Sequence, residues 1–204
     1  RPMSEPPPMH GTEGWWDVLR RLRITFGGRI QENVRADYRY ISGSETWFEG
    51  DFPFSLVSFY GQAEVRPMSG LTFLGGLGRD AYSTSFSSVM PHASVIGRPF
   101  RSTTVKAVYA EGFRAPNVYE WNYEEPDLQK RNPSLKPERI KTFEGAVEQR
   151  ISGGLFASVS AYHYRFGDLI EYSIDAGDSM LFFGNLQRLR TRGLELELNG
   201  RFDG

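Results

Sequence analysis

Few residues in this chain have the types and spacing that enzyme chemistry requires. The three histidines, His10, His92 and His163, stand apart from one another and from carboxylates at metal-ligand spacing. The absence of cysteine excludes a thiolate metal site and a cysteine nucleophile. No nucleophile elbow and no zincin motif occurs. The sequence therefore predicts no catalytic residue, no metal site and no cofactor.

Three patterns resemble sites but are explained better as structure. Residues 76–81 fit the dinucleotide pattern G-x-G-x-x-A, but the polar run 82–88 lacks the helical period that a phosphate cradle requires. Glu195 and Glu197 form a pair of carboxylates, which strand alternation places on one face without any catalytic role. The acidic run 124–127 is explained better as a solvated loop than as a cation site.

Three aromatic residues, Tyr119, Trp121 and Tyr123, occupy alternate positions in the long polar segment 113–137. Amphipathic rings on a long loop are suited to binding a ligand, because they bring contact area at a low entropic cost. The same rings are equally typical of an aromatic girdle at a membrane interface. The sequence leaves both interpretations open.

Composition limits the possible partners and favours β-structure. There are 24 Lys and Arg against 25 Asp and Glu, so the chain lacks the basic field of a general nucleic-acid binder. Aromatic residues make up 14% of the chain and glycine occurs 22 times, which favours strands over helices. No apolar run approaches the ~18 residues of a membrane-spanning helix.

Alternation with a period of two residues recurs along the chain. It is clearest in 193–202, where Leu194, Leu196 and Leu198 oppose Glu195 and Glu197. Short turns alternate with the longer polar segments 41–53, 113–137 and 171–180. We predict eight strands, at about 22–40, 54–66, 70–82, 88–97, 102–112, 138–151, 154–170 and 181–202.

The predicted fold class is all-β: an antiparallel transmembrane β-barrel segment, with about eight strands of a larger meander barrel. Most of the predicted strands exceed the ~5–6 residues usual in soluble sheets and reach the ~9–11 that cross a bilayer. A soluble β-sandwich also needs one apolar face per strand, so periodicity alone leaves it open. Residues 1–21, which include three consecutive prolines, are expected to be an extended or disordered lead-in to the barrel fragment 22–204. Both ends suggest an internal piece of a longer protein.

The chain carries the phrase F-R-A-P-x-x-x-E at 113–120 and, after a loop, the phrase N-P-x-L-K-P-E at 132–138. These two phrases, in this order, resemble the TonB-dependent outer-membrane receptor family. Glu144, Gly193 and Glu195 match the strands that follow. The motif residues are Phe113, Arg114, Ala115, Pro116 and Glu120, then Asn132, Pro133, Leu135, Lys136, Pro137 and Glu138.

The resemblance implies a barrel in the Gram-negative outer membrane that imports a scarce nutrient, such as siderophore-bound iron, haem or cobalamin. Its partners would be outer-membrane lipid, a plug domain, the remaining strands, TonB acting through the plug, and a small ligand bound by Tyr119, Trp121 and Tyr123. No enzyme activity and no nucleic-acid partner are expected. A passive or structural barrel and a soluble ligand-binding sandwich are the alternatives.

Arg114 and Glu138 flank the long loop on neighbouring strands. We expect them to pair in the lumen near its outer mouth, because a guanidinium can hold a carboxylate through two bonds.

Overall fold

The computed structural model describes residues 9–19, 21–33, 37–42, 45–84 and 86–200. Nine of its strands form one antiparallel sheet in the order β1-β2-β5-β6-β7-β8-β9-β10-β11, and two form a separate hairpin. The main strands are β1 (Met9–Leu19), β2 (Leu22–Asn33), β5 (Phe54–Met68), β6 (Leu71–Tyr82), β7 (Ser87–Phe100), β8 (Thr103–Arg114), β9 (Glu138–Arg150), β10 (Leu155–Ile174) and β11 (Leu181–Gly200). The hairpin is β3 (Asp37–Ser42) with β4 (Glu45–Asp51), and the helix is α1 (Val118–Asn122).

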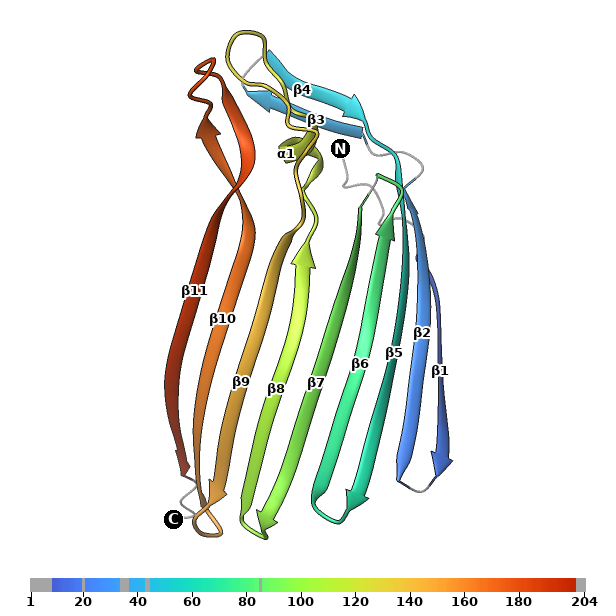
Figure 1. Cartoon of the computed structure of the whole chain (residues 1–204), viewed down its shortest axis with the longest axis vertical. Helices are drawn as coiled ribbons and strands as arrows, with labels where there is room; N and C mark the ends of the chain where they lie inside the picture. The colour runs from blue at the N-terminus through green and yellow to red at the C-terminus, as the bar shows by residue number, and fades with distance from the viewer. Residues whose placement is uncertain (1–8, 20, 34–36, 43–44, 85, 201–204) are drawn as a thin grey trace.

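The two ends of the sheet differ in their connections. Figure 1 shows tight turns at one end and, at the opposite end, α1, the β3–β4 hairpin and the long connections. Gly70 adopts a left-handed φ of 79° in the turn between β5 and β6, a conformation that favours glycine. We call the end that carries α1 the loop end and the other the turn end. β1 and β11 form the two edges of the sheet.

The structure confirms the antiparallel all-β prediction and corrects three details. β1 (Met9–Leu19) lies within the predicted lead-in 1–21 yet pairs with β2 along nearly its whole length. The predicted strand 22–40 ends at Asn33, and residues 37–42 belong to β3. The polar segment 41–53 contains β4. The segment Met9–Leu19 holds two glycines and adjacent tryptophans, so its own sequence has no two-residue period that would predict a strand. Its strand conformation is fixed by the pairing with β2. The three prolines lie outside the described residues.

From β2 onward, each strand of the sheet carries one apolar and one polar face. The apolar face bears Leu194, whereas the polar face bears Glu195. Paired residues share a face, so the pairings extend this assignment across the sheet. One apolar row runs through Leu22, Val65, Phe73, Val95, Ala107, Gly145, Ala161 and Leu194.

No second layer covers the apolar face among the described residues. Leu194, Leu196 and Leu198 expose 73%, 77% and 65% of their surface. The buried apolar side chains are few and lie at or near the loop end: Leu56, Tyr123 and Leu135. The β-sandwich alternative is therefore wrong, because a sandwich would bury these leucines between two sheets. Among the described residues no helix is long and apolar enough to span a membrane.

We expect Leu196→Arg to destabilise the full-length protein in lipid vesicles by ~2–4 kcal/mol, because it places a charge near the middle of a lipid-facing surface. The matched variant Glu197→Arg lies one residue further on the opposite face and should cost much less. Unfolding by denaturant in vesicles measures both. Equal losses would mean that the two faces do not meet different solvents.

Candidate functional site

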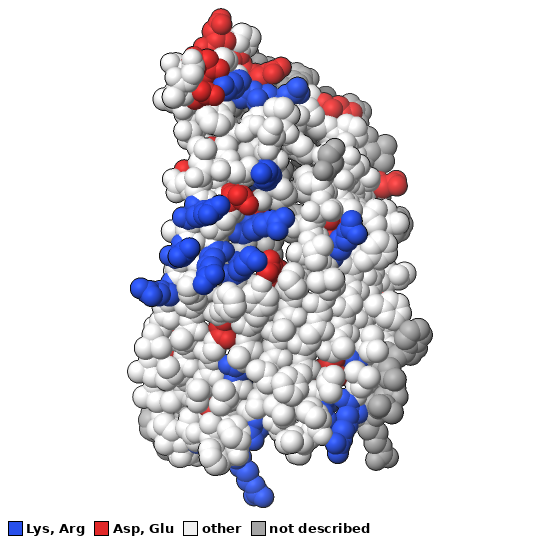
Figure 2. Space-filling model, viewed as in Figure 1, with Lys and Arg blue, Asp and Glu red and all other residues white. Residues whose placement is uncertain are grey.

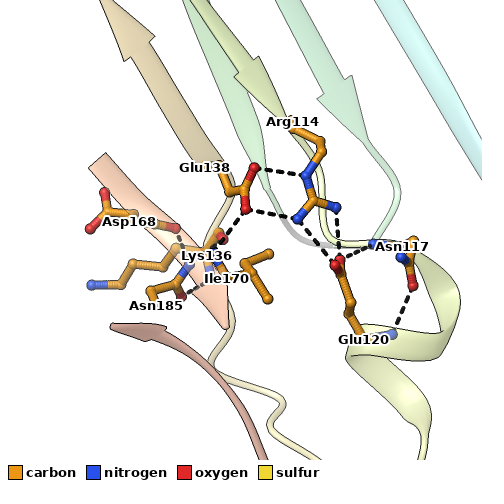
Figure 3. Close-up of polar contacts among 8 residues, drawn as sticks. All are labelled: Arg114, Asn117, Glu120, Lys136, Glu138, Asp168, Ile170 and Asn185. Carbon is orange, nitrogen blue, oxygen red and sulfur yellow. Dashed lines mark hydrogen bonds and ion pairs between the residues drawn. The ribbon is translucent and has the colours of Figure 1, made fainter. Parts of the chain in front are cut away.

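Arg114 lies at the centre of a bonded network at the loop end, on the polar face. Its Nε donates to Glu138 Oε2 at 2.7 Å and one terminal nitrogen donates to Glu138 Oε1 at 2.8 Å, which makes a two-bond ion pair between the last residue of β8 and the first of β9. The predicted pairing is therefore confirmed. Figure 3 shows a second carboxylate, Glu120, against the same guanidinium, at 2.9 and 3.1 Å.

Glu120 links this pair to helix α1. Its carboxylate also accepts from the backbone N–H of Asn117 at 2.8 Å, while the Asn117 side chain accepts from the Glu120 N–H at 2.8 Å. This reciprocal capping box satisfies donors at the start of a helix too short to be stable alone. Arg114 therefore holds α1 against the ends of β8 and β9.

The second motif phrase docks onto β10 and β11 through Asn185. The Asn185 side chain accepts from the Lys136 N–H and donates to the Lys136 carbonyl, both at 2.8 Å, and it donates to the Asp168 carbonyl at 2.7 Å. Asp168 has a left-handed φ of 56° at an irregularity in the β10–β11 pairing. Glu138 completes the junction by accepting from the Ile170 N–H at 2.9 Å (Figure 3).

The remaining motif residues pack or turn the loop. Asn132 donates to the Phe183 carbonyl at 2.8 Å and accepts from the Ser134 N–H at 3.0 Å. Leu135 is buried, Pro133 is exposed, and Pro137 immediately precedes β9. In the first phrase, Pro116 is buried and the Phe113 ring meets Tyr82 edge to face with centroids 6.3 Å apart.

The three aromatics of the loop do not form one surface. Tyr119 and Tyr123 lie four residues apart at α1 and stack with ring centroids 4.4 Å apart, and the Tyr119 ring also contacts Phe183. Tyr123 is 5% exposed and bonds to Glu125 at 3.0 Å; burial raises its pKa well above the usual range. Trp121 points elsewhere, because residues two apart on a helix occupy different faces.

Trp121 lines a cavity of about 400 Å³ at the loop end. Its ring lies 5.9 Å from that of Phe86, which stacks on Tyr82 at 4.5 Å. The main apolar walls are Phe52, Phe54, Tyr82, Phe86, Pro116 and Trp121, with Asp51, Thr84 and Asn122 as polar groups. Such a cavity suits a small ligand with flat or apolar parts.

A second set of ion pairs, which we call the Lys130 tie, joins the long loop to the β10–β11 connection. The Lys130 ammonium lies 2.6 Å from Asp175 Oδ2 and 2.7 Å from Asp178 Oδ2. Hydrogen bonds from Lys130 lower the pKa of both carboxyls, and the two carboxylates raise the pKa of Lys130. Backbone bonds between Lys130 and Leu181 and between Leu181 and Leu128, each 2.9 Å, run beside this ion pair.

Further along the polar face, a tyrosine pair covers Glu144 and Gly193. The Tyr164 hydroxyl donates to Glu144 at 2.8 Å, and Tyr162 stacks on Tyr164 with centroids 4.8 Å apart. A Cβ on Gly193 would overlap the Tyr162 ring where it now lies, so a larger residue there would displace that ring. Glu195 follows on the same strand face. In the described part of the chain no group of three or more His, Asp or Glu side chains gathers as a metal site would.

The sequence model of the TonB dependent receptor-like beta-barrel family matches residues 8–204. The chain belongs to this family. Its nine-stranded sheet is a segment of a TonB-dependent receptor barrel.

Solved structures with the same fold are TonB-dependent receptors of low sequence identity. The siderophore receptor PirA from Pseudomonas aeruginosa matches 92% of this chain and 36% of its own length, with 19% identity and a TM-score of 0.73. A mutant of the ferric enterobactin receptor PfeA from the same organism, in complex with enterobactin, matches 92% and 32%, with 18% identity and a TM-score of 0.77. The FrpB iron transporter from Neisseria meningitidis matches 94% and 32%, with 16% identity and a TM-score of 0.69. The chain spans about a third of these proteins.

Sequence reasoning missed several residues of this end of the sheet. Asn185 stands among the family matches, but nothing in the sequence assigns it three bonds to two other segments. The link from Lys130 to Asp175 and Asp178 spans 45 and 48 residues. Phe52 lies in the predicted polar segment 41–53 and Phe54 begins the next predicted strand, while Tyr82 and Phe86 lie beside the gap between the predicted strands 70–82 and 88–97. Aromatic residues at strand ends were the available signal.

Double-mutant cycles in the full receptor should give coupling energies of about 1 kcal/mol for each of the pairs Arg114–Glu138 and Arg114–Glu120, since the guanidinium is partly exposed but held by two bonds from each carboxylate. The variants are Arg114→Met, Glu138→Gln and Glu120→Gln, with unfolding free energy as the readout. Exchanging Arg114 and Glu138 should fail to restore stability, because the new carboxylate would face Glu120. A coupling energy found for only one of the two pairs would contradict the conclusion that Arg114 is bound by both carboxylates.

The Lys130 tie should protect the amides of Lys130 and Leu181 from hydrogen exchange between about pH 4 and 10. The folded pKa values of the two aspartates are lowered, so their contribution is complete above the unfolded value of about 3.9 and is lost as pH falls through the folded values. The raised pKa of Lys130 preserves the tie until pH rises beyond about 10.4. Lys130→Met should remove the extra protection at neutral pH, whereas Lys136→Met, an exposed lysine nearby, should not.

Proposed function

We propose that this chain forms part of an outer-membrane receptor that binds a scarce nutrient outside the cell and imports it with energy delivered by TonB through a plug domain. The family assignment supports this function, and the matched structures include siderophore and iron receptors. The loop end then faces the exterior and the turn end faces the periplasm. Transport is a conformational event without covalent chemistry, so the chain needs no catalytic group.

The cavity at Trp121 is the part of this segment that we assign to the ligand. The observation that carries the assignment is the direct attachment of the cavity to the motif network. Pro116 and Trp121 lie on either side of Asn117 and Glu120, which Arg114 holds in place. A ligand that touches Trp121 therefore meets a wall anchored to two strands.

Tyr119 and Tyr123 have a supporting role in this proposal. Their rings contact each other, the Tyr119 ring contacts Phe183 of β11, and Tyr123 is buried, so they set the position of α1 more than they offer contact area. Glu144, Gly193 and Glu195 belong to the lumen wall below. We infer that the ligand class is a ferric siderophore with aromatic groups, because rings bind well against Phe86 and Trp121.

Trp121→Ala in the full receptor should weaken binding of ferric enterobactin, used as an aromatic probe, by about tenfold or more, as loss of a tryptophan contact typically does. Trp121→Phe should retain most of the affinity. Tyr119→Phe, which keeps the ring away from the cavity, serves as the control and should bind as the unmodified receptor does. Binding to cells and uptake of radioactive iron provide the readouts.

Unchanged ligand binding by the Trp121→Ala receptor would contradict the proposal that the ligand binds in this cavity. Import that continues in cells without TonB would contradict the active receptor itself and favour a passive barrel.

A further inference from the structure

Two strands lead from the Trp121 cavity down the polar face of the sheet. Phe54 of β5 and Tyr82 of β6 belong to the cavity wall, and their ring centroids lie 6.1 Å apart. Alternation from Val65 and Phe73, which lie on the apolar face, places both residues on the polar face. The next polar-face positions of β5 and β6 therefore continue from the cavity toward the turn end (Figure 1).

A hollow of about 460 Å³ lies on these strands just below the cavity, and we call it the polar hollow. Its lining includes the polar side chains of Glu13, Arg29, Ser58, Tyr60 and Asp80. Register places Arg29, Ser58 and Asp80 in one row across β2, β5 and β6. Asp80 is the polar-face position next to Tyr82, about 7 Å along the strand. The cavity and the polar hollow are thus consecutive parts of one wall.

The polar hollow offers hydrogen-bonding groups to a ligand. The Ser58 Oγ is buried and has no hydrogen-bond partner within the described ranges. Buried polar atoms rarely stay unpaired in proteins, so this hydroxyl is available to a group that enters the hollow. Arg29, its neighbour in the row, is exposed and carries five N–H donors, enough to serve a protein group and a ligand oxygen together. These donors suit the oxygen-rich surface of a metal chelate.

Below the polar hollow the wall is recessed by a glycine strip, which consists of Gly27, Gly76 and Gly78. These glycines lie on the polar face of β2 and β6, in the next two rows toward the turn end. The Tyr60 ring lies so close to Gly27, and the His92 ring so close to Gly76, that a Cβ on either glycine would overlap the ring. Each ring therefore leans over the neighbouring strand. Glycine inside a strand often marks the close approach of a ligand, and here it continues the line from the hollow.

The polar face of β9 and β11 differs from this strip, because it carries Glu144, Glu148, Glu195 and Glu197. In the part of the chain that the structure describes, only Glu148 among them forms an ion pair, with Lys106. A group of carboxylates repels an oxygen-rich chelate. The side of the sheet formed by β2, β5 and β6 therefore offers the ligand the easier passage.

We propose that the imported ligand passes from the Trp121 cavity into the polar hollow and then along the glycine strip. Arg29 and the Ser58 hydroxyl bind oxygen atoms of the ligand on the way, and Gly78 provides clearance. Asp80 offsets the charge of Arg29 and keeps this contact weak, because a ligand must leave each point of a route as well as enter it. The route rests on the proposed function, since it requires that the chain belongs to an importer.

Substitutions of Gly78 in the full receptor test the route. A Cβ at Gly78 would first meet the flexible end of Met90, at 3.3 Å, so a side chain there adds bulk without displacing backbone. Gly78→Phe should slow uptake of radioactive iron, supplied as ferric enterobactin, about tenfold by narrowing the route, whereas Gly78→Ala should import near the unmodified rate. Binding of ferric enterobactin to energy-depleted cells should be unchanged in both variants, because the Trp121 cavity is intact.

Gly75 provides the matched control on the apolar face of the same strand. A Cβ at Gly75 has open space around it, so Gly75→Phe adds the same ring without strain. Figure 2 shows basic side chains gathered mainly over β9, β10 and β11, away from this position on β6. Gly75→Phe should therefore bind and import as the unmodified receptor does.

A second pair of variants tests the contact with the ligand. Arg29→Gln should slow uptake about threefold through the loss of one weak contact, with surface binding unchanged. Arg79→Gln removes the same charge from the apolar face of β6, next to Asp80 in the sequence, and should leave uptake unchanged.

Uptake by the Gly78→Phe receptor at the unmodified rate would overturn the route. A loss of surface binding as large as the loss of uptake would also overturn it, because Gly78 would then belong to the binding cavity. If Gly78→Phe does not reach the outer membrane, Arg29→Gln decides the test, and its unchanged uptake overturns the route equally. An unmodified receptor that imports no ferric siderophore would contradict the proposed function instead, so the two failures are distinguishable.

Discussion

A single layer of strands separates two environments, and every other feature of this chain follows from that constraint. Because no second sheet or helix layer covers either face of the sheet among the residues that the structure describes, each strand residue meets whatever lies on its own side. Leu194, Leu196 and Leu198 suit acyl chains, whereas Glu195 and Glu197 suit a polar lumen. The free energy that a soluble protein obtains from its core is not available to such a sheet, and under the proposed function it would come from lipid, from neighbouring strands and from whatever fills the lumen.

The loop end is built differently from the rest of the sheet, and Arg114 connects its parts. A guanidinium can serve two carboxylates at once, so a single side chain fixes the ends of β8 and β9 and the start of α1. Asn185 then fixes the second strand of the next hairpin to the same loop. A long connection that would otherwise be loose becomes a positioned wall for the cavity at Trp121.

Charge on the two faces has distinct uses. On the polar face, Arg114, Glu120 and Glu138 compensate one another within the chain. On the apolar face, Lys141, Arg165 and Arg190 stand opposite one another in one row. The row continues into β8 at Glu111, whose carboxylate pairs with Lys141, whereas another row of the same face is apolar where Leu77 pairs with Pro91. Since barrel strands are tilted, a row of paired residues changes depth in the membrane as it crosses the sheet, and the change from apolar to basic follows that depth.

The sequence by itself determined the strand class, the two faces of the clearly alternating strands and the ion pair of Arg114 with Glu138, because alternation and motif spacing can be followed along the chain. In 154–166 both faces carry apolar residues, so only the pairing of β10 with β9 and β11 assigned its sides. It could not determine β1, whose glycines and adjacent tryptophans erase the two-residue period, nor the split of 22–40 between two sheets. Only the tertiary structure decided that Tyr119 and Tyr123 stack while Trp121 faces Phe86, since a helical turn replaces the alternation that the sequence suggested. It also decided the partners of Asn185 and Lys130 and the cationic row, because strand register joins residues that lie far apart in the chain.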